Sequence, residues 1–222
     1  MAESKPADPS VSRDGKSAEV PPAPGASPGS HPPAPQPPAP QPPFVRPAAQ
    51  PPFVRQVPDG DSRARLVCAD CGFVNYENPK VVVGAVVRHE GRILMCRRAI
   101  DPRRGFWTLP AGYLELNETT PEGAKREAWE EARAKIEIEG LLAVYSIPRL
   151  SQVQVMFRAR LAEPAIAPGP ESLEVRLFAW DEIPWAEIAF PSVRWALGHD
   201  REIGEARHFA ARTNPPGELG NY

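Results

Sequence analysis

The stretch from Gly112 to Ala134, GYLELNETTPEGAKREAWEEARA, constrains this chain more than any other, because it joins an irregular loop to a strongly charged helix. Pro121 suits the first turn of a helix that Thr119 or Thr120 can cap. Glu122–Ala132 contains no proline and only one glycine, and its Ala, Glu, Lys and Arg residues favour helix. The stretch therefore predicts a loop followed by a helix.

Three glutamates crowd one face of this predicted helix. Glu127, Glu130 and Glu131 stand at positions i, i+3 and i+4, where like charges cost roughly 0.2–0.5 kcal/mol per pair. A cation between them would remove that cost. Mg²⁺ is a hard cation that commonly joins protein carboxylates to substrate phosphates. The spacing indicates a divalent-cation site, and a solvated charged face is the plain alternative.

The same stretch resembles the Nudix box: Gly, five residues, Glu, seven residues, then Arg-Glu-aliphatic-any-Glu-Glu-any-Gly-aliphatic. Its charged and glycine positions are filled by Gly112, Glu118, Arg126, Glu127, Glu130 and Glu131. The chain departs from the pattern at Ala128 and Ala134, which fill the aliphatic positions, and at Arg133, which replaces the second glycine. That glycine normally closes the helix in a left-handed conformation. An arginine there costs roughly 1 kcal/mol if the geometry is kept, and otherwise the helix runs on slightly.

The resemblance implies a hydrolase, dependent on Mg²⁺ or Mn²⁺, that cleaves the pyrophosphate bond of a nucleoside diphosphate derivative. It makes Glu127 and Glu131 the main metal ligands, with Glu130 beside them or acting through water. The carbonyl of Ala111 and, through water, Glu115 are further expected ligands. These three helix glutamates are also the expected catalytic residues.

The resemblance also suggests supporting residues and a catalytic base. Glu118 and Arg126 are expected to pair and to brace the loop on the helix, next to the box glycine, Gly112. The base that activates water often comes from a later loop in this family, and Glu171 and Glu174 are the candidates.

Substrate contacts are expected just before the box. Arg103 and Arg104, in a polar loop, can meet phosphates, with a solvated loop as the alternative. Trp107 can stack on a base or lie in the core. The flanks YENPKVVVGAVV, RRGFWTLPAGYLE and APGPESLEVRLFAWDEIP resemble a Nudix subgroup of bacteria and plant chloroplasts that cleaves FAD and ADP-ribose. FAD or ADP-ribose, releasing AMP, is therefore the favoured substrate. A nucleotide-sensing Nudix module with weak catalysis is the alternative, and Arg133 is the feature that points to it.

The chain divides into four predicted parts. Residues 1–58 hold 18 of the 30 prolines, including PPAPQPPAPQPP, which predicts a disordered tail rich in polyproline II. Its QPPFVR repeats can also bind a proline-recognising partner. Residues 59–79 hold Cys68 and Cys71, half of a zinc ribbon. We interpret this knuckle as a relic, and zinc completed by a histidine or by a second subunit is the alternative. The catalytic domain is expected at 80–210 and a frayed C-terminus at 211–222.

The hydrophobic pattern predicts an α/β fold. Strands are expected at 80–88, 92–98, 106–109, 136–147, 152–161 and 173–180, with a second helix within 188–199. This order predicts a mixed β-sheet with helices on both faces, and the Nudix resemblance implies an α/β/α sandwich.

Composition excludes several classes of protein. A net charge of −2 argues against nucleic acid or a membrane surface as partner. Three cysteines fit a reducing, cytoplasmic compartment rather than a disulfide framework. No apolar run is long enough to cross a membrane. A homodimer is compatible with the family but is not indicated by any sequence feature.

Overall fold

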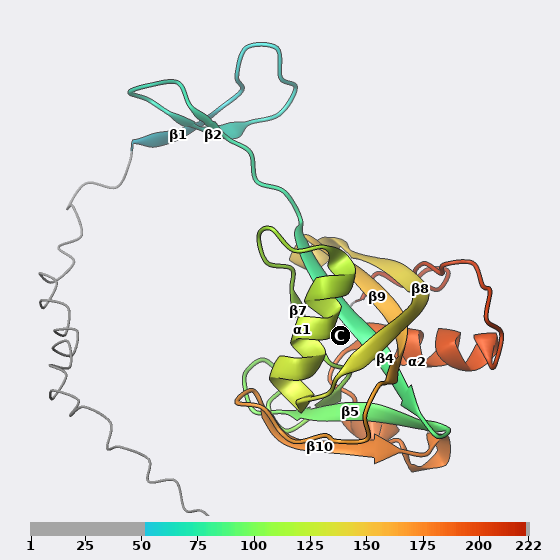
Figure 1. Cartoon of the computed structure of the whole chain (residues 1–222). Coiled ribbons are helices and arrows are strands. Elements are labelled where there is room, and N and C mark those ends of the chain that lie inside the picture. Colours follow the sequence, from blue (N-terminus) through green and yellow to red (C-terminus); the bar gives the residue numbers. More distant parts are fainter. Residues whose placement is uncertain (1–51, 221–222) are drawn as a thin grey trace, which may run out of the picture. The chain divides into compact units, whose positions relative to one another are not determined.

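The computed structural model describes residues 52–220, so almost all of the predicted proline-rich tail lies outside the described residues. The described part comprises a small ribbon and a larger α/β body (Figure 1). Within it, no helix combines the length and the apolar character that crossing a membrane requires.

The ribbon is a three-stranded antiparallel sheet in the order β1-β2-β3. Its strands are β1 (Phe53–Gln56), β2 (Arg65–Cys68) and β3 (Val74–Asn75). Strand β1 falls inside the stretch predicted to be the tail, so regular structure begins before the predicted boundary at residue 58. The physical reason is local: Phe53 and Val54 favour extended backbone, and β2 offers them a partner.

The body is built on a seven-stranded mixed sheet, which confirms the predicted fold class. Its main path runs β10-β5-β4-β9-β8, with β6 paired to β5 and β7 paired to β4. The β4–β9 pair is parallel and the other pairs are antiparallel. The strands are β4 (Lys80–His89), β5 (Arg92–Arg98), β6 (Trp107–Thr108), β7 (Ala111–Tyr113), β8 (Ile136–Ile147), β9 (Gln152–Leu161) and β10 (Ser172–Phe178). Register shifts along β8 make it one irregular strand.

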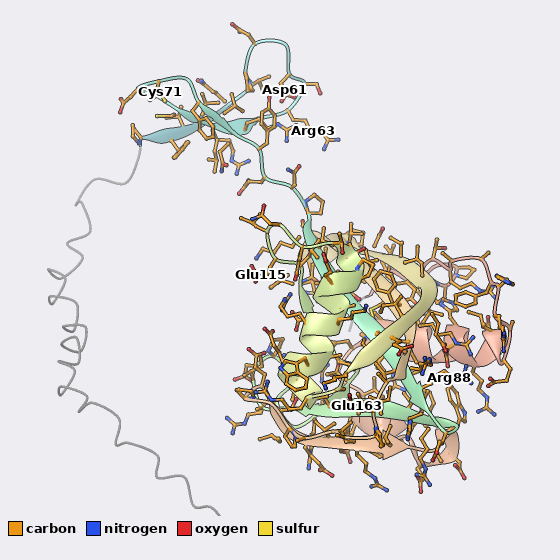
Figure 2. All side chains as sticks on the ribbon, viewed as in Figure 1. Asp61, Arg63, Cys71, Arg88, Glu115 and Glu163 are labelled. Carbon is orange, nitrogen blue, oxygen red and sulfur yellow. The ribbon has the colours of Figure 1, made fainter. Side chains whose placement is uncertain are left out.

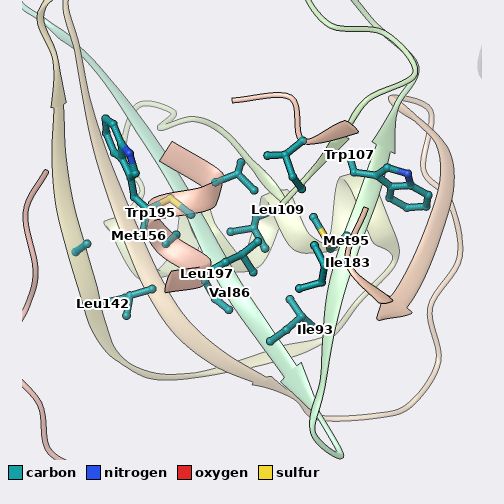
Figure 3. Packing of buried hydrophobic residues seen from close by; sticks show 14 of the residues in the cluster. Val86, Ile93, Met95, Trp107, Leu109, Leu142, Met156, Ile183, Trp195 and Leu197 are labelled. Carbon is teal, nitrogen blue, oxygen red and sulfur yellow. The ribbon is translucent and has the colours of Figure 1, made fainter. Parts of the chain in front are cut away.

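Two helices complete the sandwich (Figure 1). Helix α1 spans Thr120–Ala132 and α2 spans Pro191–Ile203, with short 3₁₀ turns at Pro148–Leu150, Trp180–Glu182 and Trp185–Glu187. The core divides accordingly. Val86, Met95 and Leu142 pack with Trp195 and Leu197 of α2 (Figure 3), whereas the second cluster joins α1 to the other face of the sheet.

Small residues bring α1 close to the sheet. Ala124, Ala128 and Ala132 are fully buried, against Val83 and neighbouring strand residues. The helix begins with a capping box in which Thr119 caps the backbone of Glu122 and the Glu122 carboxylate accepts the Thr119 N–H. The start of the helix is therefore fixed locally, and its axis is fixed by alanine packing.

The C-terminal segment is tied down rather than frayed, as far as Gly220, where the described residues end. Arg212 donates its N–H to Leu142 and accepts one from Val144, so it extends the edge beside β8. The Asn214 side chain exchanges hydrogen bonds with the backbone of Ser146. Fraying was predicted here, but the described residues are held at the sheet edge by the backbone of Arg212 and the side chain of Asn214.

The loop between β9 and β10 docks on the end of α1. Ala167 donates its N–H to the carbonyl of Ala132, and Gly169 donates to that of Glu131, at 2.9 and 3.0 Å. These carbonyls belong to the last turn of the helix and lack intrahelical partners. A methyl group on Gly169 would lie 1.6 Å from the carbonyl oxygen of Glu130. Only glycine allows this approach, which positions the start of β10 and residue 171 beside the helix.

We predict that Gly169→Ala destabilises the protein by about 1–3 kcal/mol, because the loop must move away from the helix end. Urea unfolding followed by circular dichroism measures the change. The matched control is Gly198→Ala in α2, where an added methyl meets nothing within 4 Å and helix propensity favours alanine. Equal stability of the two variants would show that the loop does not depend on this contact.

Candidate active site

A cavity of about 910 Å³ opens beside α1 and β7. The box contributes Gly112, Glu115, Arg126, Glu127, Glu130 and Glu131 to its wall. Tyr113 of the same stretch also lines it, and segments distant in sequence contribute Arg98, Gln152, Gln154, Glu171 and Phe190. The fold therefore gathers the acidic helix face, an arginine, two amides and aromatic rings around one hollow large enough for a nucleotide derivative.

The Arg126 guanidinium joins the carboxylates of the box. Its Nε and Nη2 donate to Glu118 at 3.0 and 2.8 Å, and Nη1 donates to Glu127 and Glu130 at 2.8 and 2.9 Å. Nη2 also donates to the carbonyl of Tyr113. One cation thus ties the loop to the helix, and the hydrogen bonds from Arg126 and from the Glu115 N–H lower the pKa of Glu118.

The Glu127 carboxylate lies so close to residue 112 that only glycine fits there. A methyl group at Gly112 would stand 2.4–2.5 Å from the Glu127 carboxyl atoms. Its neighbour Ala111 pairs with Gly84 of β4, and the N–H of Ala111 donates to Glu131 at 3.2 Å. The box glycine is therefore a point of close approach, which lets β7 lie directly on the acidic face of α1.

Two of the three helix carboxylates are largely withdrawn from water. Glu127 is 8% exposed and Glu131 is 6% exposed. Burial raises the pKa of Glu131 to about 8, opposed by the Ala111 N–H and assisted by the charge of Glu127. Burial also raises the pKa of Glu127, and Arg126 opposes that rise. The Glu130 side chain remains about half exposed.

The donor set suits a hard divalent cation. One cavity is lined by Glu115, Glu127, Glu130, Glu131 and Ala111, and Mg²⁺ and Mn²⁺ prefer oxygen ligands. No three Cys, His, Asp or Glu side chains within residues 52–220 already converge as a metal site. The reason is visible in the contacts: Arg126 Nη1 holds both Glu127 and Glu130. These oxygen ligands are of the type that the ion prefers. To bind it, Glu127 or Glu130 must release its hydrogen bond from the Arg126 guanidinium.

Arg133 keeps the geometry of the glycine that it replaces. It closes α1 in the left-handed conformation, with φ 51° and ψ 23°, and the Ala134 N–H reaches back to the carbonyl of Ala128. The helix therefore ends at Ala132 and does not run on. Arg133, the residue that pointed to a nucleotide-sensing module with weak catalysis, therefore leaves the acidic face of α1 undistorted.

The structure separates the two candidate bases. Glu171 lines the cavity, and its charge contributes to the raised pKa of both Glu127 and Glu131. Glu174 lies along β10, where its carboxylate faces Arg97 at 3.8 Å, and it is not among the cavity-lining residues.

The expected substrate contacts before the box are not brought to the cavity. Trp107 is 5% exposed and packs edge-on against Phe178 in the core. Arg103 lies over the ring of Phe106, and neither it nor Arg104 lines the hollow. Of the two positions considered for Trp107, the structure shows the core, because β6 pairs with β5 and the ring packs inward against Phe178.

Sequence reasoning missed residues that do line the cavity. Arg98 ends β5, and its charge acts on Glu131. Gln152 and Gln154 stand on one face of β9, with Gln154 Nε2 donating to Gln152 and Gln152 Nε2 to the Tyr113 hydroxyl. The available signal was the alternation itself, because Gln152 and Gln154 share a largely polar face of β9 that alternates with the apolar face of Val153 and Val155.

Comparison with known proteins agrees with this site. The sequence profile described as NUDIX domain matches residues 78–196, and the one described as Nudix N-terminal, a zinc ribbon, matches residues 50–77. A solved NUDIX hydrolase from Nitrosomonas europaea is 46% identical, with a TM-score of 0.68, over 73% of this chain and 93% of that one.

Two curated relatives are more distant. A MutT-like protein of Streptomyces ambofaciens is 38% identical over 102 residues, 46% of this chain and 64% of the relative. An ADP-ribose pyrophosphatase of Methanocaldococcus jannaschii is 29% identical over 119 residues, 52% of this chain and 69% of the relative. The chain thus spans slightly less than two thirds of the MutT-like relative. With a family match over more than half of its length and the box residues assembled at one cavity, this chain belongs to the Nudix family.

Proposed function

We propose that this protein is a hydrolase, dependent on Mg²⁺ or Mn²⁺, that cleaves the pyrophosphate bond of a nucleoside diphosphate derivative, with ADP-ribose or FAD as substrate and AMP as product. The observation that carries the proposal is the pair of largely buried carboxylates, Glu127 and Glu131, on the wall of a nucleotide-sized cavity. Burying such charges is costly unless they are paired or bind metal. Similarity to a relative named ADP-ribose pyrophosphatase supports the substrate class.

The chain's own residues supply ligands and orientation. Glu127, Glu131 and Glu130 would hold the metal, together with the Ala111 carbonyl and, through water, Glu115. When bound, such an ion polarises a phosphoryl oxygen and makes a bound water more acidic. Arg126 and Glu118 keep the loop on the helix, and the backbone N–H of Ala111 fixes the orientation of Glu131.

Substrate binding is proposed to use the residues that the cavity gathers. Arg98, which lines the wall, is proposed to bind a phosphate oxygen in place of Arg103 and Arg104. The rings of Tyr113 and Phe190 offer apolar surfaces for a base or a sugar, and Gln152 offers amide hydrogen bonds.

Glu171 is the proposed base. Its position on the cavity wall allows it to accept a proton from water that attacks phosphorus, as the pyrophosphate bond breaks. Docking of residues 167–169 on the end of α1 holds this glutamate beside the helix carboxylates. Glu174 has no comparable position, because it faces Arg97 outside the cavity.

The proposal is tested by incubating the protein with FAD, ADP-ribose, NADH and dGTP, each with Mg²⁺ and with EDTA, and separating the products by chromatography. We expect Mg²⁺-dependent release of AMP from ADP-ribose or FAD. Cleavage of dGTP alone would reject the substrate class. Binding of a nucleotide without cleavage of any would instead support the sensing module.

We predict that Glu171→Gln lowers kcat by about 10²–10⁴-fold, the usual contribution of a general base. KM should change little, because the amide keeps the size and polarity of the side chain. Steady-state kinetics on the best substrate of the panel measures both constants.

The matched control is Glu174→Gln in β10. This variant should retain wild-type kcat, because Glu174 faces Arg97 and does not line the cavity. The opposite outcome, with Glu174→Gln inactive and Glu171→Gln active, would reassign the base.

A further inference from the structure

The ribbon presents two thiols at its turn. Cys68 ends β2 and Cys71 lies in the turn that leads to β3, where Figure 2 marks it. The turn is closed by hydrogen bonds from the Gly72 N–H to the Cys68 carbonyl and from the Cys68 N–H to the Phe73 carbonyl, at 2.9 and 2.8 Å. Gly72 has φ +73°, which is accessible to glycine without strain.

Backbone donors are directed at one of the sulfurs. The N–H groups of Cys71 and Asp70 hydrogen-bond to Cys68. A turn that directs N–H groups at sulfur is preorganised for a thiolate, which is the form that binds metal. Cys71 is exposed and Cys68 is partly exposed, so both are accessible to an ion.

Within residues 52–220 of one chain, the two thiols do not complete a structural zinc site. Such a site is almost always tetrahedral with four ligands. The whole sequence has one further cysteine, Cys96, which is 1% exposed in the body's core and whose pKa burial raises. No third Cys, His, Asp or Glu joins the pair anywhere in the described part of the chain. The zinc implied by the matched N-terminal region therefore does not fit the two thiols of a single chain.

The surroundings of the thiols suggest what covers them. Phe53 pairs with Cys68 across β1 and β2 and is 37% exposed, and Phe73, two residues after Cys71, is 59% exposed. Val54, next to Phe53, is 44% exposed. Apolar side chains thus flank the thiols and remain in contact with water, which favours association with another apolar surface.

We propose that two copies of this chain share one Zn²⁺ ion, bound by Cys68 and Cys71 of each copy. The four thiols lose four protons to solvent as four sulfur–zinc bonds form, which satisfies the coordination of the ion. A second copy supplies the two missing ligands and an equal apolar rim of phenylalanines. This inference is independent of the proposed hydrolase activity.

The test uses the full chain, reduced and freed of metal by EDTA. Zn²⁺ is titrated in competition with a colorimetric chelator, and mass is followed by sedimentation velocity. We expect saturation at one zinc ion for two chains, with a monomer-to-dimer shift at the same point. Substitution by Co²⁺ should give the absorption of tetrahedral thiolate coordination.

Three variants and a chemical measurement sharpen the test. Cys68→Ser and Cys71→Ser should each lose both zinc binding and the shift, whereas Cys96→Ala should keep them. Alkylation of the wild-type protein, resolved by mass spectrometry, should show Cys68 and Cys71 protected by Zn²⁺, which does not depend on the folding of any variant.

Three results would overturn the proposal. The first is one zinc ion per monomer, which would indicate ligands from elsewhere in the same chain, for example His31. The second is no zinc binding by the reduced protein. The third is a dimer that is unaffected by EDTA and by Cys68→Ser, which would place the interface on another surface.

Discussion

The contacts of the Arg126 guanidinium are the interaction on which the site depends. Five hydrogen bonds connect it to Glu118, Glu127, Glu130 and the Tyr113 carbonyl. Without this cation, Glu127 and Glu130 would lose the hydrogen bonds that offset the repulsion among the helix carboxylates, and the charge of the largely buried Glu127 would be unpaired. The arginine therefore stabilises the protein without bound metal and at the same time fixes the loop that carries Glu115. When a divalent cation binds, Arg126 can lose its hydrogen bonds to Glu127 and Glu130 and still keep those to Glu118.

Close packing gives this network its place in the fold. The alanines of α1 let the helix lie directly on β4 and β9, and Gly112 lets β7 approach the Glu127 carboxylate. At the other end of the helix, Arg133 adopts the left-handed conformation, and the loop before β10 satisfies the last carbonyls. The acidic face is thus fixed at its start by a capping box, along its length by alanine packing, and at its end by the segment that carries Glu171.

The sequence predicted most of the architecture, because strands such as β4 and β9 have clear hydrophobic patterns and the box has a long, specific spacing. It placed the Arg126–Glu118 pair correctly in space, since both belong to one local motif. It failed where the position depends on contacts between distant segments. The C-terminal segment, for example, is ordered because the Asn214 side chain bonds to the backbone of β8. Arg98 and Gln154 reach the cavity only through the sheet topology, which the local pattern does not contain.

The central claim is that the buried carboxylates of α1 form a site for a divalent cation. Titration of Mn²⁺ into the protein, followed by the electron paramagnetic resonance signal of the free ion, tests it most directly. The account predicts that the wild-type protein and Glu163→Gln, which alters an exposed carboxylate paired with Lys135, bind the ion equally, and that Glu131→Gln binds it much more weakly while remaining folded. Equal binding by Glu131→Gln and the wild-type protein would contradict the claim.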